Sequence, residues 1–407
     1  MLNKADIVEA ARSAGIGASD GLPAEIKLES KADIVIANGC ELEPLVFSSR
    51  HVLLHNAAEI INGLELAMQA TQAARGIVAY VKRIPEIDAA VQAAACGHAG
   101  IEIFHAPPFY PIEDDFTIAC AATGRVVPNS ATLAAIGVCV LDVETLYNLS
   151  RAAGGNPANE RTVSITGEVA QPAVLRLPLG TTVGEAIERC GGAKNDDFRV
   201  LLGGPISGRI ADDLSQPISR CTAAIVVLPA NHVQIQRRMR PLSVMLLHAR
   251  TACTACEECT RYCTRYLSGQ DIEPHQIMRV ISYSLDSLNK SITSAVNCHE
   301  CGVCDIVCRM GLSPRVICRE IKAHLRAMGW STPASDIDGQ LRTGFMKNRV
   351  PLEELAERLG VQKYVQAIDP QQILNAGVAP LRTVDGVMIH PLQTGEEAPA
   401  QERRKEE

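Results

Sequence analysis

The hydrophobic pattern of the first 150 or so residues switches repeatedly between two periods. Short apolar runs with polar ends predict buried strands, and stretches with apolar residues three and four positions apart predict helices. The predicted strands are 32–37, 76–81 and 101–105, and the predicted helices are 4–14, 49–71 and 84–96. This alternation is typical of an α/β domain with a parallel sheet. A further apolar run, 133–141, is expected to be a buried core segment because it is far too short to cross a bilayer.

The pattern changes between residues 160 and 232. Shorter segments with alternating apolar and polar residues predict strands, interrupted by one helical stretch that ends at two glycines. The predicted order is strand 161–168, strand 173–177, helix 183–189, strand 198–202 and strand 223–228. Strand, strand, helix and strand within so short a stretch indicate a small β-grasp-like module.

The pattern is helical again from about 238 to 328, where we expect an all-helical arrangement with a helix at 274–285. A short helix is predicted at 351–360, which begins with Pro351 and ends with Gly360. The tail 394–407 is charged, lacks core-forming residues and is expected to be disordered.

Composition narrows the class of protein. The 407 residues provide room for two to four domains, and a hydrophobic content of 47% permits packed cores. A net charge of −7 and an aromatic content of 3% argue against a nucleic-acid partner. No apolar run approaches the ~20 residues of a transmembrane helix, and the N-terminus lacks the layout of a signal peptide. We therefore expect a cytoplasmic protein in a reducing compartment.

The strongest chemical signal is a pair of matching cysteine runs, which contain eight of the fifteen cysteines. Each run has the spacing Cys-x2-Cys-x2-Cys-x3-Cys, and the members are Cys253, Cys256, Cys259 and Cys263 in the first and Cys298, Cys301, Cys304 and Cys308 in the second. This spacing suits two [4Fe-4S] clusters, in which the fourth cysteine of each run binds the other cluster. The expected groups are Cys253, Cys256, Cys259 and Cys308, and Cys298, Cys301, Cys304 and Cys263.

Two alternatives to iron–sulfur clusters are structural zinc and disulfides. Zinc sites usually use two separated Cys-x2-Cys pairs, and a disulfide framework fits poorly in a long chain without a secretory signal. Ferredoxin motifs usually carry proline after the fourth cysteine, whereas Thr264 and Arg309 stand there. For the cysteines outside the runs we expect small buried hydrophobic residues, with Cys40 also a candidate redox thiol; they are Cys40, Cys96, Cys120, Cys139, Cys190, Cys221 and Cys318.

The order of these parts resembles the RnfC-like family, which contains one component of the Rnf electron-transport complex, and by layout its branch of cobalamin reductases from propanediol-utilisation microcompartments. The resemblance covers residues 1 to about 365. It rests on the two cysteine runs and on the segments 21–27 (GLPAEIK), 38–44 (NGCELEP), 123–128 (TGRVVP), 203–208 (GGPISG) and 349–364. The first domain of this family is similar to the FMN- and NADH-binding flavoprotein subunit of respiratory complex I, and the second is a β-grasp domain of the SLBB type.

The resemblance implies a set of cofactor-binding residues. In the family a Gly-rich loop, here containing Gly17 and Gly21, wraps the phosphates of FMN and NADH, because backbone amides must approach the oxygens closely. Lys27 matches a lysine at the phosphate or flavin, and Asn38 matches an asparagine near the flavin. Glu41 matches a carboxylate that contacts NADH, and Glu43 closes the same turn. No side chain is expected to act as a catalytic acid or base.

The Gly-rich loop departs from the family pattern. Ala18, Ser19 and Asp20 stand where glycine or alanine is expected, Leu22 replaces an aromatic residue, and a carboxylate facing phosphates is repulsive. Three functions therefore stay open. The first is an NADH-dependent iron–sulfur flavoprotein reductase, and the second is a non-enzymatic electron-transfer adaptor that has lost NADH and FMN binding. The third is a scaffold with vestigial clusters, which eight intact ligands argue against.

The expected fold is therefore multidomain: α/β, then β-grasp of SLBB type, then an all-helical ferredoxin-like two-cluster domain. The expected boundaries are 1–155 for the FMN/NADH domain, 156–235 for the β-grasp domain, 236–330 for the cluster domain, 331–393 for a C-terminal extension with a barrel-sandwich remnant at 376–392, and 394–407 for the tail. By resemblance the electrons pass from NADH through FMN and the clusters to cobalamin. The implied partners are a redox partner protein or a cobalamin-dependent enzyme system, and the shell or cargo of a bacterial microcompartment. The implied location is the interior of such a microcompartment.

Overall fold

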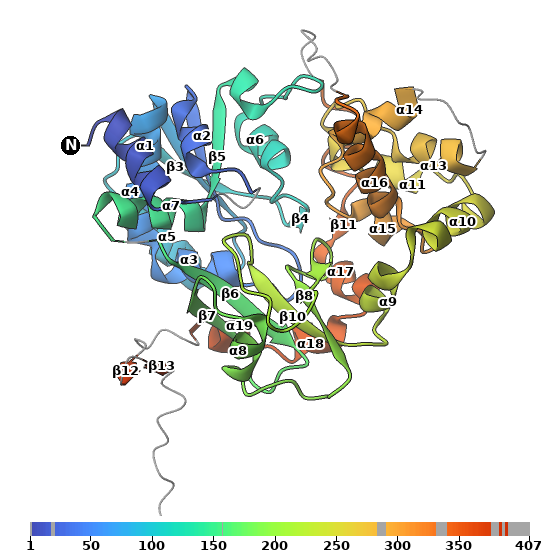
Figure 1. The fold of residues 1–407 in the computed structure, drawn as a ribbon. Coiled ribbons are helices and arrows are strands. Elements are labelled where there is room, and N and C mark those ends of the chain that lie inside the picture. The colour runs from blue at the N-terminus through green and yellow to red at the C-terminus, as the bar shows by residue number, and fades with distance from the viewer. Residues whose placement is uncertain are drawn as a thin grey trace, which may run out of the picture.

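The computed structural model of this chain describes residues 2–17, 21–156, 158–282, 290–330, 340–375, 382–384 and 387–389. Figure 1 shows an α/β region in blue and teal, a smaller β region in green below it, and a helical region in yellow and orange on the other side. The short strands β4 (Phe109–Tyr110) and β11 (Val350–Pro351) lie between the α/β and helical regions.

The α/β region is built on a four-stranded parallel sheet with the order β3-β2-β1-β5. Its strands are β1 (Ile34–Asn38), β2 (Arg75–Tyr80), β3 (Ile101–His105) and β5 (Val138–Asp142). The carboxyl ends of all four therefore share one edge, where ligands of open α/β sheets bind. The segment 133–141 is thus more than buried core, because its second half is the strand beside β1.

Helices cover both faces of this sheet. Alternate side chains of β1 point to opposite faces, so that Val35 and Ala37 join one apolar cluster while Ile34 and Ile36 join another. The first cluster packs against α1 (Lys4–Ser13), α4 (Ala57–Thr71) and α7 (Val143–Ala153), and the second against α6 (Asp115–Thr123). The remaining elements are α2 (Ala24–Glu29), α5 (Pro85–Ala95) and the 3-10 helix η1 (Leu133–Ile136).

The prediction of a single helix at 49–71 is wrong. Two helices stand there, α3 (Ser48–His55) and α4, and the chain breaks at Asn56, whose φ of −132° and ψ of 28° are not helical. The Asn56 side chain accepts a hydrogen bond from Arg176 of the β region at 2.8 Å. A contact from a distant part of the chain, which periodicity does not reveal, therefore accompanies the break.

The β region contains a five-stranded sheet with the order β7-β6-β10-β8-β9. Its strands are β6 (Glu160–Gly167), β7 (Ala173–Pro178), β8 (Phe198–Leu202), β9 (Arg209–Ile210) and β10 (Ala224–Pro229). The helix α8 (Val183–Glu188) packs on it through Val183, Ala186 and Ile187. The loop 203–208 joins β8 to β9 and points toward the rest of the molecule, where it takes part in the site described below.

The helical region runs from α9 (Val233–Met239) to α16 (Pro314–Ala327), and its described residues contain no strand. The other members are α10 (Leu242–Ala252), α11 (Glu258–Arg261), α12 (Thr264–Leu267), α13 (Pro274–Ser282), α14 (Lys290–Thr293), η2 (Ser294–Asn297) and α15 (Val303–Val307). The cysteine runs lie at the turns between these short helices, with Cys259 inside α11 and Cys304 inside α15.

The C-terminal part returns to the α/β region. β11 pairs with β4, and α17 (Leu352–Leu359), α18 (Gln362–Gln366) and α19 (Pro370–Asn375) follow. α17 begins after Pro351 and ends at Gly360, as the sequence predicts. In the segment 376–392, the described residues form an antiparallel ribbon of β12 (Arg382–Val384) and β13 (Val387–Ile389). The tail 394–407 lies outside the described residues.

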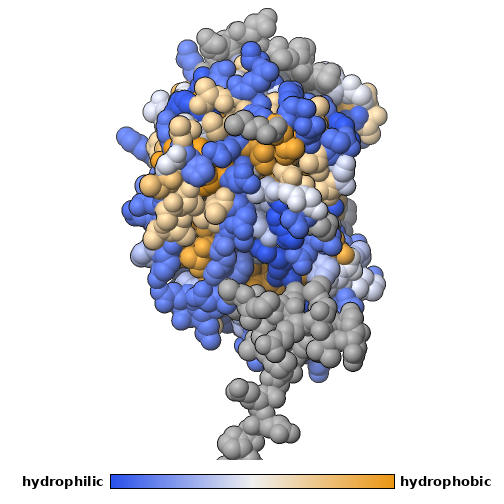
Figure 2. Space-filling view, turned by 90° about the vertical axis from the view of Figure 1, so that its left-hand side faces the viewer, coloured by the Kyte–Doolittle hydropathy of each residue, from blue (hydrophilic) through white to orange (hydrophobic). Residues whose placement is uncertain are grey.

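Hydrophilic residues dominate the face seen in Figure 2, where apolar side chains gather in separate patches. In the portion of the chain that the structure describes, no helix is long and apolar enough to cross a membrane.

Candidate cofactor site

A cavity of about 760 Å³ lies between the α/β region and the helical region. Its walls include Lys27 of α2, the strand β5, the segment that follows β4, and the second cysteine turn with Cys301. A volume of this size falls within the roughly 300–1,000 Å³ of ligand sites. The cavity therefore connects the sheet of the α/β region directly to a cysteine turn.

Two of the predicted flavin residues meet at one carboxylate on the wall of this cavity. Lys27 Nζ lies 3.5 Å from Asp115 Oδ2 and donates to the Val140 carbonyl of β5 at 3.1 Å. Asn38 Nδ2 lies 3.4 Å from Asp115 Oδ1 and donates to the Glu113 carbonyl at 2.8 Å. The α2 lysine and the residue that ends β1 are thus brought together through Asp115, which the sequence analysis did not single out.

The predicted NADH residue Glu41 lies elsewhere. Its carboxylate accepts hydrogen bonds from the Ser48 hydroxyl and the Ser49 amide, at 2.8 and 2.9 Å, and it forms an ion pair with Arg50 at 3.7 Å. Negative charge at the start of a helix is stabilising, because the first amides of α3 have no partner within the helix. Glu41 lines a second cavity of about 460 Å³ rather than the one at Lys27.

Glu43 connects the α/β region to the loop 203–208 of the β region. Its carboxylate accepts from the amides of Ile206 and Ser207 and from the Ser207 hydroxyl. Burial raises the pKa of Glu43, and the hydrogen bonds from Ser207 and Ile206 oppose that shift. Two segments that carried the family resemblance, 38–44 and 203–208, therefore hold each other in place.

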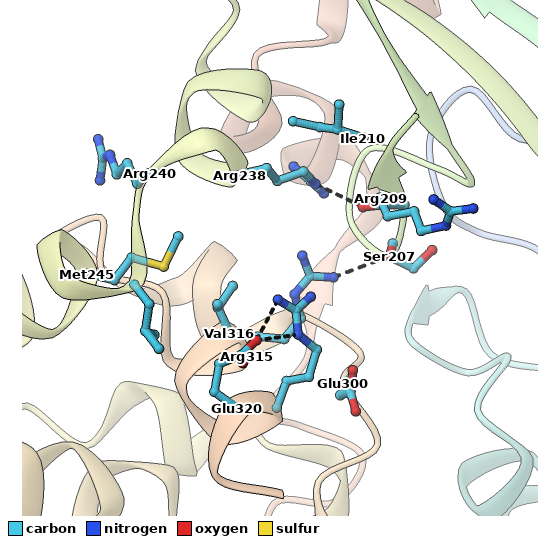
Figure 3. Close-up of a pocket in the computed structure, with 13 residues that line it drawn as sticks. Ser207, Arg209, Ile210, Arg238, Arg240, Met245, Glu300, Arg315, Val316 and Glu320 are labelled. Atoms are coloured by element: carbon cyan, nitrogen blue, oxygen red, sulfur yellow. Dashed lines mark hydrogen bonds and ion pairs between the residues drawn. The ribbon is translucent and has the colours of Figure 1, made fainter. Parts of the chain in front are cut away.

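The same loop is held from its other side by two arginines, as Figure 3 shows. Arg238 donates to the carbonyls of Pro205, Ile206 and Gly208 at 2.7–2.9 Å. Arg315 donates to the Ile206 carbonyl at 2.7 Å and lies 3.6 Å from Asp305. Amides of the loop thus face Glu43 and carbonyls face arginines, which fixes the loop between the flavin-like region and the cysteine turn.

The Gly-rich loop is described in part. Gly17 forms an isolated β-bridge with Pro23, and Gly21 has a φ of 81° that side chains rarely adopt. Arg220 of the β region approaches this loop and donates to the Ala14 carbonyl at 3.1 Å. Ala18, Ser19 and Asp20, the departures from the family pattern, lie outside the described residues.

The eight cysteines of the two runs fall into two sets by electrostatic contact. Cys259 interacts with Cys308, Cys253 and Cys256. We call these four cysteines the outer group. Cys263 interacts with Cys301 and Cys298, and Cys304 with the same two and, to a smaller extent, with Cys259. We call Cys263, Cys298, Cys301 and Cys304 the inner group; all four line one small cavity together with Cys318.

Burial raises the pKa of Cys259, Cys263 and Cys301 to about 12. Such thiols ionise when a bound metal supplies positive charge. Among the described residues no three His, Cys, Asp or Glu side chains converge closely enough for a single metal ion. Zinc needs its thiolates about 2.3 Å from one ion, whereas a cluster holds them at the corners of a cube. The Cys-x2-Cys-x2-Cys-x3-Cys spacing of these donors fits [4Fe-4S] clusters better than zinc.

A chain of acidic residues follows β4 and was missed at the sequence level. Glu113 Oε2 is shielded from solvent and has no hydrogen-bond partner among the described residues. Burial, together with the charges of Glu43, Glu41 and Asp114, raises the pKa of Glu113 to about 8. At neutral pH it therefore presents a protonated carboxyl group, with Oε2 unpaired among the described residues, to a cavity that also holds Lys27. An unpaired polar atom beside apolar walls fits an organic cofactor such as FMN.

The adjacent Asp114 belongs to the cysteine side of the site. It lies 3.0 Å from Arg265 and 3.4 Å from His299, and Thr117 donates to it twice. Burial opposes ionisation, but Arg265 and His299 hold the pKa of Asp114 below its usual value. The run Glu113-Asp114-Asp115 after Tyr110-Pro111 was the available sequence signal, since three acids next to a buried strand need partners.

The prediction for the other cysteines is right for five of the seven. Cys40, Cys120, Cys139, Cys190 and Cys318 are buried, whereas Cys96 and Cys221 are exposed, so the prediction is wrong for those two. Burial, the larger effect, and the charge of Glu113 raise the pKa of Cys40 well above its usual value, which gives no support to a reactive thiol. Cys318 is more than a small apolar residue, because it forms a hydrogen bond with Cys298.

Three protein families match successive parts of the chain. The Nuo51 FMN-binding domain matches residues 8–151, the SLBB domain 162–209 and the 4Fe-4S dicluster domain 252–313. Together with the cavity and the thiol groups, these matches define an iron–sulfur flavoprotein oxidoreductase, with FMN and iron–sulfur clusters as its cofactors. They give no support to the interpretation that flavin binding has been lost.

Individual relatives place the chain more narrowly. It is 33% identical to the cobalamin reductase PduS of Salmonella typhimurium over 372 residues, which cover 90% of this chain and 81% of that protein. It is 27% identical over 265 residues to the RnfC-type component of the proton-translocating ferredoxin:NAD(+) oxidoreductase complex of Clostridium ljungdahlii, covering 63% of this chain and 55% of that one. The chain belongs to the family that contains these cobalamin reductases and RnfC-type components.

Solved structures support the fold. An NAD+-reducing [NiFe]-hydrogenase in the air-oxidised state aligns with a TM-score of 0.53 at 19% identity, covering 90% of this chain and 67% of the hydrogenase chain. The H2-reduced state gives a TM-score of 0.52. At this identity the likeness concerns the fold alone.

Proposed function

We propose that this protein is an NADH-dependent reductase that passes electrons through FMN and two [4Fe-4S] clusters to a cobalamin. One observation carries the proposal: a single cavity is lined both by Lys27 of the FMN-like region and by Cys301 of a cysteine turn. A flavin there would lie beside a cluster without an intervening domain. The cobalamin acceptor is taken from the PduS relatives, whose name states that activity.

In this proposal FMN supplies the conversion of a hydride pair into single electrons, and the clusters conduct them. Lys27 provides a positive charge, fixed by Asp115 and the Val140 carbonyl, for a phosphate or an anionic ring. Glu113, protonated at neutral pH, offers a hydroxyl donor to a ring acceptor. Asn38 orients the Glu113 backbone through its carbonyl. These side chains bind and orient, and none of them has to transfer a proton.

The route of the electrons follows from the position of the two thiol groups. The inner group holds the cluster nearest the cavity, because Cys301 lines it, and Tyr110 of β4 donates to the Cys301 carbonyl at 2.7 Å. The outer group, in which Cys256 is exposed, holds the cluster that meets the acceptor. The exchange of the fourth cysteines between the runs keeps the clusters close together.

Other features of the assignment stay predictions. These are the domain boundaries near residues 155, 235 and 330, the role of Glu41 at NADH, and the contributions of Gly17 and Gly21. A cytoplasmic location is the expectation drawn from the sequence. A place inside a microcompartment, with its shell or cargo or a redox protein as partner, rests on the family resemblance alone.

The proposal is tested by anaerobic purification followed by spectra before and after acid precipitation. Flavin released into the supernatant and a broad cluster absorbance in the native protein are expected, and added NADH should bleach both. A Lys27→Met variant should retain FMN about ten- to a hundredfold more weakly, since hydrogen bonds to charged groups contribute roughly 1.5–3 kcal/mol. Lys4→Met, which removes a lysine bonded to the Glu29 carbonyl away from the cavity, is the matched control.

Cluster absorbance without any flavin would contradict the proposal and leave an electron-transfer adaptor. Flavin that is present but not bleached by NADH would reject NADH as the donor while keeping the flavoprotein.

A further inference from the structure

Arg349 lies in the segment 340–350, beyond the three parts of the chain that known families match. Its guanidinium carbon is 4.4 Å from the ring centre of Phe109 and 4.6 Å from that of Phe345. The next residue, Val350, pairs with Tyr110, whose hydroxyl donates to the Cys301 carbonyl. This segment therefore carries a cation into the junction between β4 and the inner cysteine turn.

The guanidinium group of Arg349 is buried without a partner. The residue is 8% exposed, and none of its three side-chain nitrogens has a hydrogen-bond partner among the residues that the structure describes. Buried charges are normally paired, because the loss of water is costly. Arg315, buried to the same degree, donates to the Ile206 carbonyl and lies beside Asp305. Two aromatic faces contribute a weaker, cation–π attraction at Arg349.

The groups that can carry negative charge near Arg349 are Cys301 and Cys263 of the inner group, Asp114 and Cys120. Burial lowers the pKa of Arg349 to about 10, and these four groups oppose this shift. The Arg349 side chain is therefore protonated at neutral pH. Burial raises the pKa of Cys120 above its usual value, so this thiol is uncharged at neutral pH. Asp114 is already paired with Arg265 at 3.0 Å. The charge available to balance Arg349 is thus that of the thiolates and the cluster they hold.

We propose that Arg349 is the counter-ion of the cluster bound by the inner group and that its charge raises the reduction potential of that cluster. The inference rests on the proposed function, which places a cluster on these thiolates. A cluster with four thiolates gains negative charge on reduction, and net charge is one of the factors that set its potential. A fixed cation nearby stabilises the reduced state more than the oxidised state. Arg349 would act on the cluster through its electrostatic field and not as a ligand, because none of its contacts described above is to a thiolate or a substrate.

The test is a redox titration of the anaerobically purified, full-length protein, followed by electron paramagnetic resonance. The variants are Arg349→Met, which removes the charge, and Arg349→Lys, which keeps it. Cys256→Ser, which alters the outer group, identifies the signal of each cluster. In Arg349→Met the inner midpoint should move to a more negative value, with about a tenfold change in the oxidised-to-reduced ratio at a fixed potential, or about 59 mV for one electron. The midpoint potential of the outer cluster should not move. In Arg349→Lys the oxidised-to-reduced ratio of the inner cluster should stay within about threefold of that in the unmodified protein.

An unshifted inner midpoint in Arg349→Met overturns the inference, as does an equal shift in Arg349→Lys. Should Arg349→Met fail to assemble, Arg349→Gln repeats the comparison. Loss of the inner cluster in both neutral variants but not in Arg349→Lys supports a counter-ion, whereas loss in all three contradicts it. If the unmodified protein binds no inner cluster, the proposed function fails, and this outcome is distinct from two intact clusters that ignore Arg349.

Discussion

The two cysteine turns share one backbone conformation and have different surroundings. Ala255 and Glu257 of the first turn have φ values of 53° and 66°, and Glu300 and Gly302 at the same positions of the second have 68° and 78°. Glu257 is exposed, whereas Gly302 is buried. A Cβ atom at Gly302 would lie 2.7 Å from Ile206 Cγ2 of the loop 203–208. One turn therefore faces solvent, and the other is a docking surface.

The spacing of the cysteines thus determines which residues bind a cluster, while the surroundings of each turn determine which groups lie next to that cluster. Tyr110, Arg265 and Arg315 lie against the inner turn, and Arg349 interacts electrostatically with Cys301. The outer turn carries the exposed Cys256. We interpret the same motif, used twice, as the input and the output of one electron path.

The largest expected effect comes from removing an inner thiolate. Cys301→Ser should lower electron transfer from NADH to an external acceptor about a hundredfold or more, given that even groups supporting a metal ligand contribute 10–100-fold. Reduction of the flavin by NADH should persist. In Cys256→Ser, by contrast, NADH should still reduce the inner cluster. Steady-state assays and cluster bleaching after NADH addition measure both effects. A Cys256→Ser protein whose inner cluster NADH cannot reduce would contradict the assignment of the inner turn as the input of the electron path.

The second prediction concerns Gly302 and its counterpart Glu257. Gly302→Ala should lower the free energy of unfolding by about 2–5 kcal/mol, because overpacking costs roughly 1–3 kcal/mol and a positive φ adds about 1–2 kcal/mol for a residue with a side chain. Glu257→Ala should change it by less than about 1 kcal/mol, since a side chain already occupies this conformation. Denaturant unfolding of the cluster-loaded proteins provides the measurement. Equal losses in both variants would show that the inner turn is not a docking surface.

The third prediction is a pH dependence on the inner side. The pKa of Glu113 is raised from 4.5 to about 8, so between these values the folded state holds a proton that the unfolded state has lost. Stability should therefore fall as pH rises from 5 to 8, by a few kcal/mol at about 1.36 kcal/mol per pKa unit. Glu113→Gln should flatten this slope, as unfolding midpoints in flavin-free protein at pH 5.5 and 8 will show. If stability depends on pH equally in Glu113→Gln and in the unmodified protein, Glu113 is not the group responsible for this pH dependence.

The smallest expected effect concerns the hydrogen bond between Cys318 and Cys298 of the inner group. The Cys318 thiol is the main cause that lowers the pKa of Cys298. Because hydrogen bonds to ligand sulfur tune cluster potentials, Cys318→Ala should shift the inner midpoint negatively by less than about 59 mV, the equivalent of tenfold for one electron. Cys318→Ser keeps a hydrogen-bond donor and should shift the inner midpoint less. A shift of the outer midpoint in place of the inner one would contradict the assignment of Cys318 to the inner cluster.

Much of the fold was predictable because its elements are local. The alternating pattern predicted β1, β2, β3 and the five segments of the β region to within about two residues, an accuracy typical of strongly periodic segments. The single helix at 49–71 failed because Asn56 meets Arg176, more than a hundred residues away. The strand β5 was predicted only as an unspecified core segment, since a short apolar run does not reveal its neighbour in a sheet.

The residues of the site could be predicted only where a sequence motif itself contains the ligands. The cysteine runs and Lys27 could be identified from spacing or resemblance. Asp115, Glu113 and Arg349 could not, because their roles arise from contacts between segments far apart in the chain. Arg349 stood inside a segment noted for resemblance, but nothing in the sequence shows that two phenylalanines bury it beside Cys301.

The proposed electron path requires that electrons reach the inner cluster first. Rapid mixing of the anaerobic protein with NADH, followed by freeze-quenching and electron paramagnetic resonance, measures the order directly once Cys256→Ser has identified the outer signal. The account predicts that the inner signal appears before the outer signal, and that the outer signal appears in Cys301→Ser at least about a hundredfold more slowly. An outer signal that precedes the inner one, or that forms at an unchanged rate in Cys301→Ser, would contradict it.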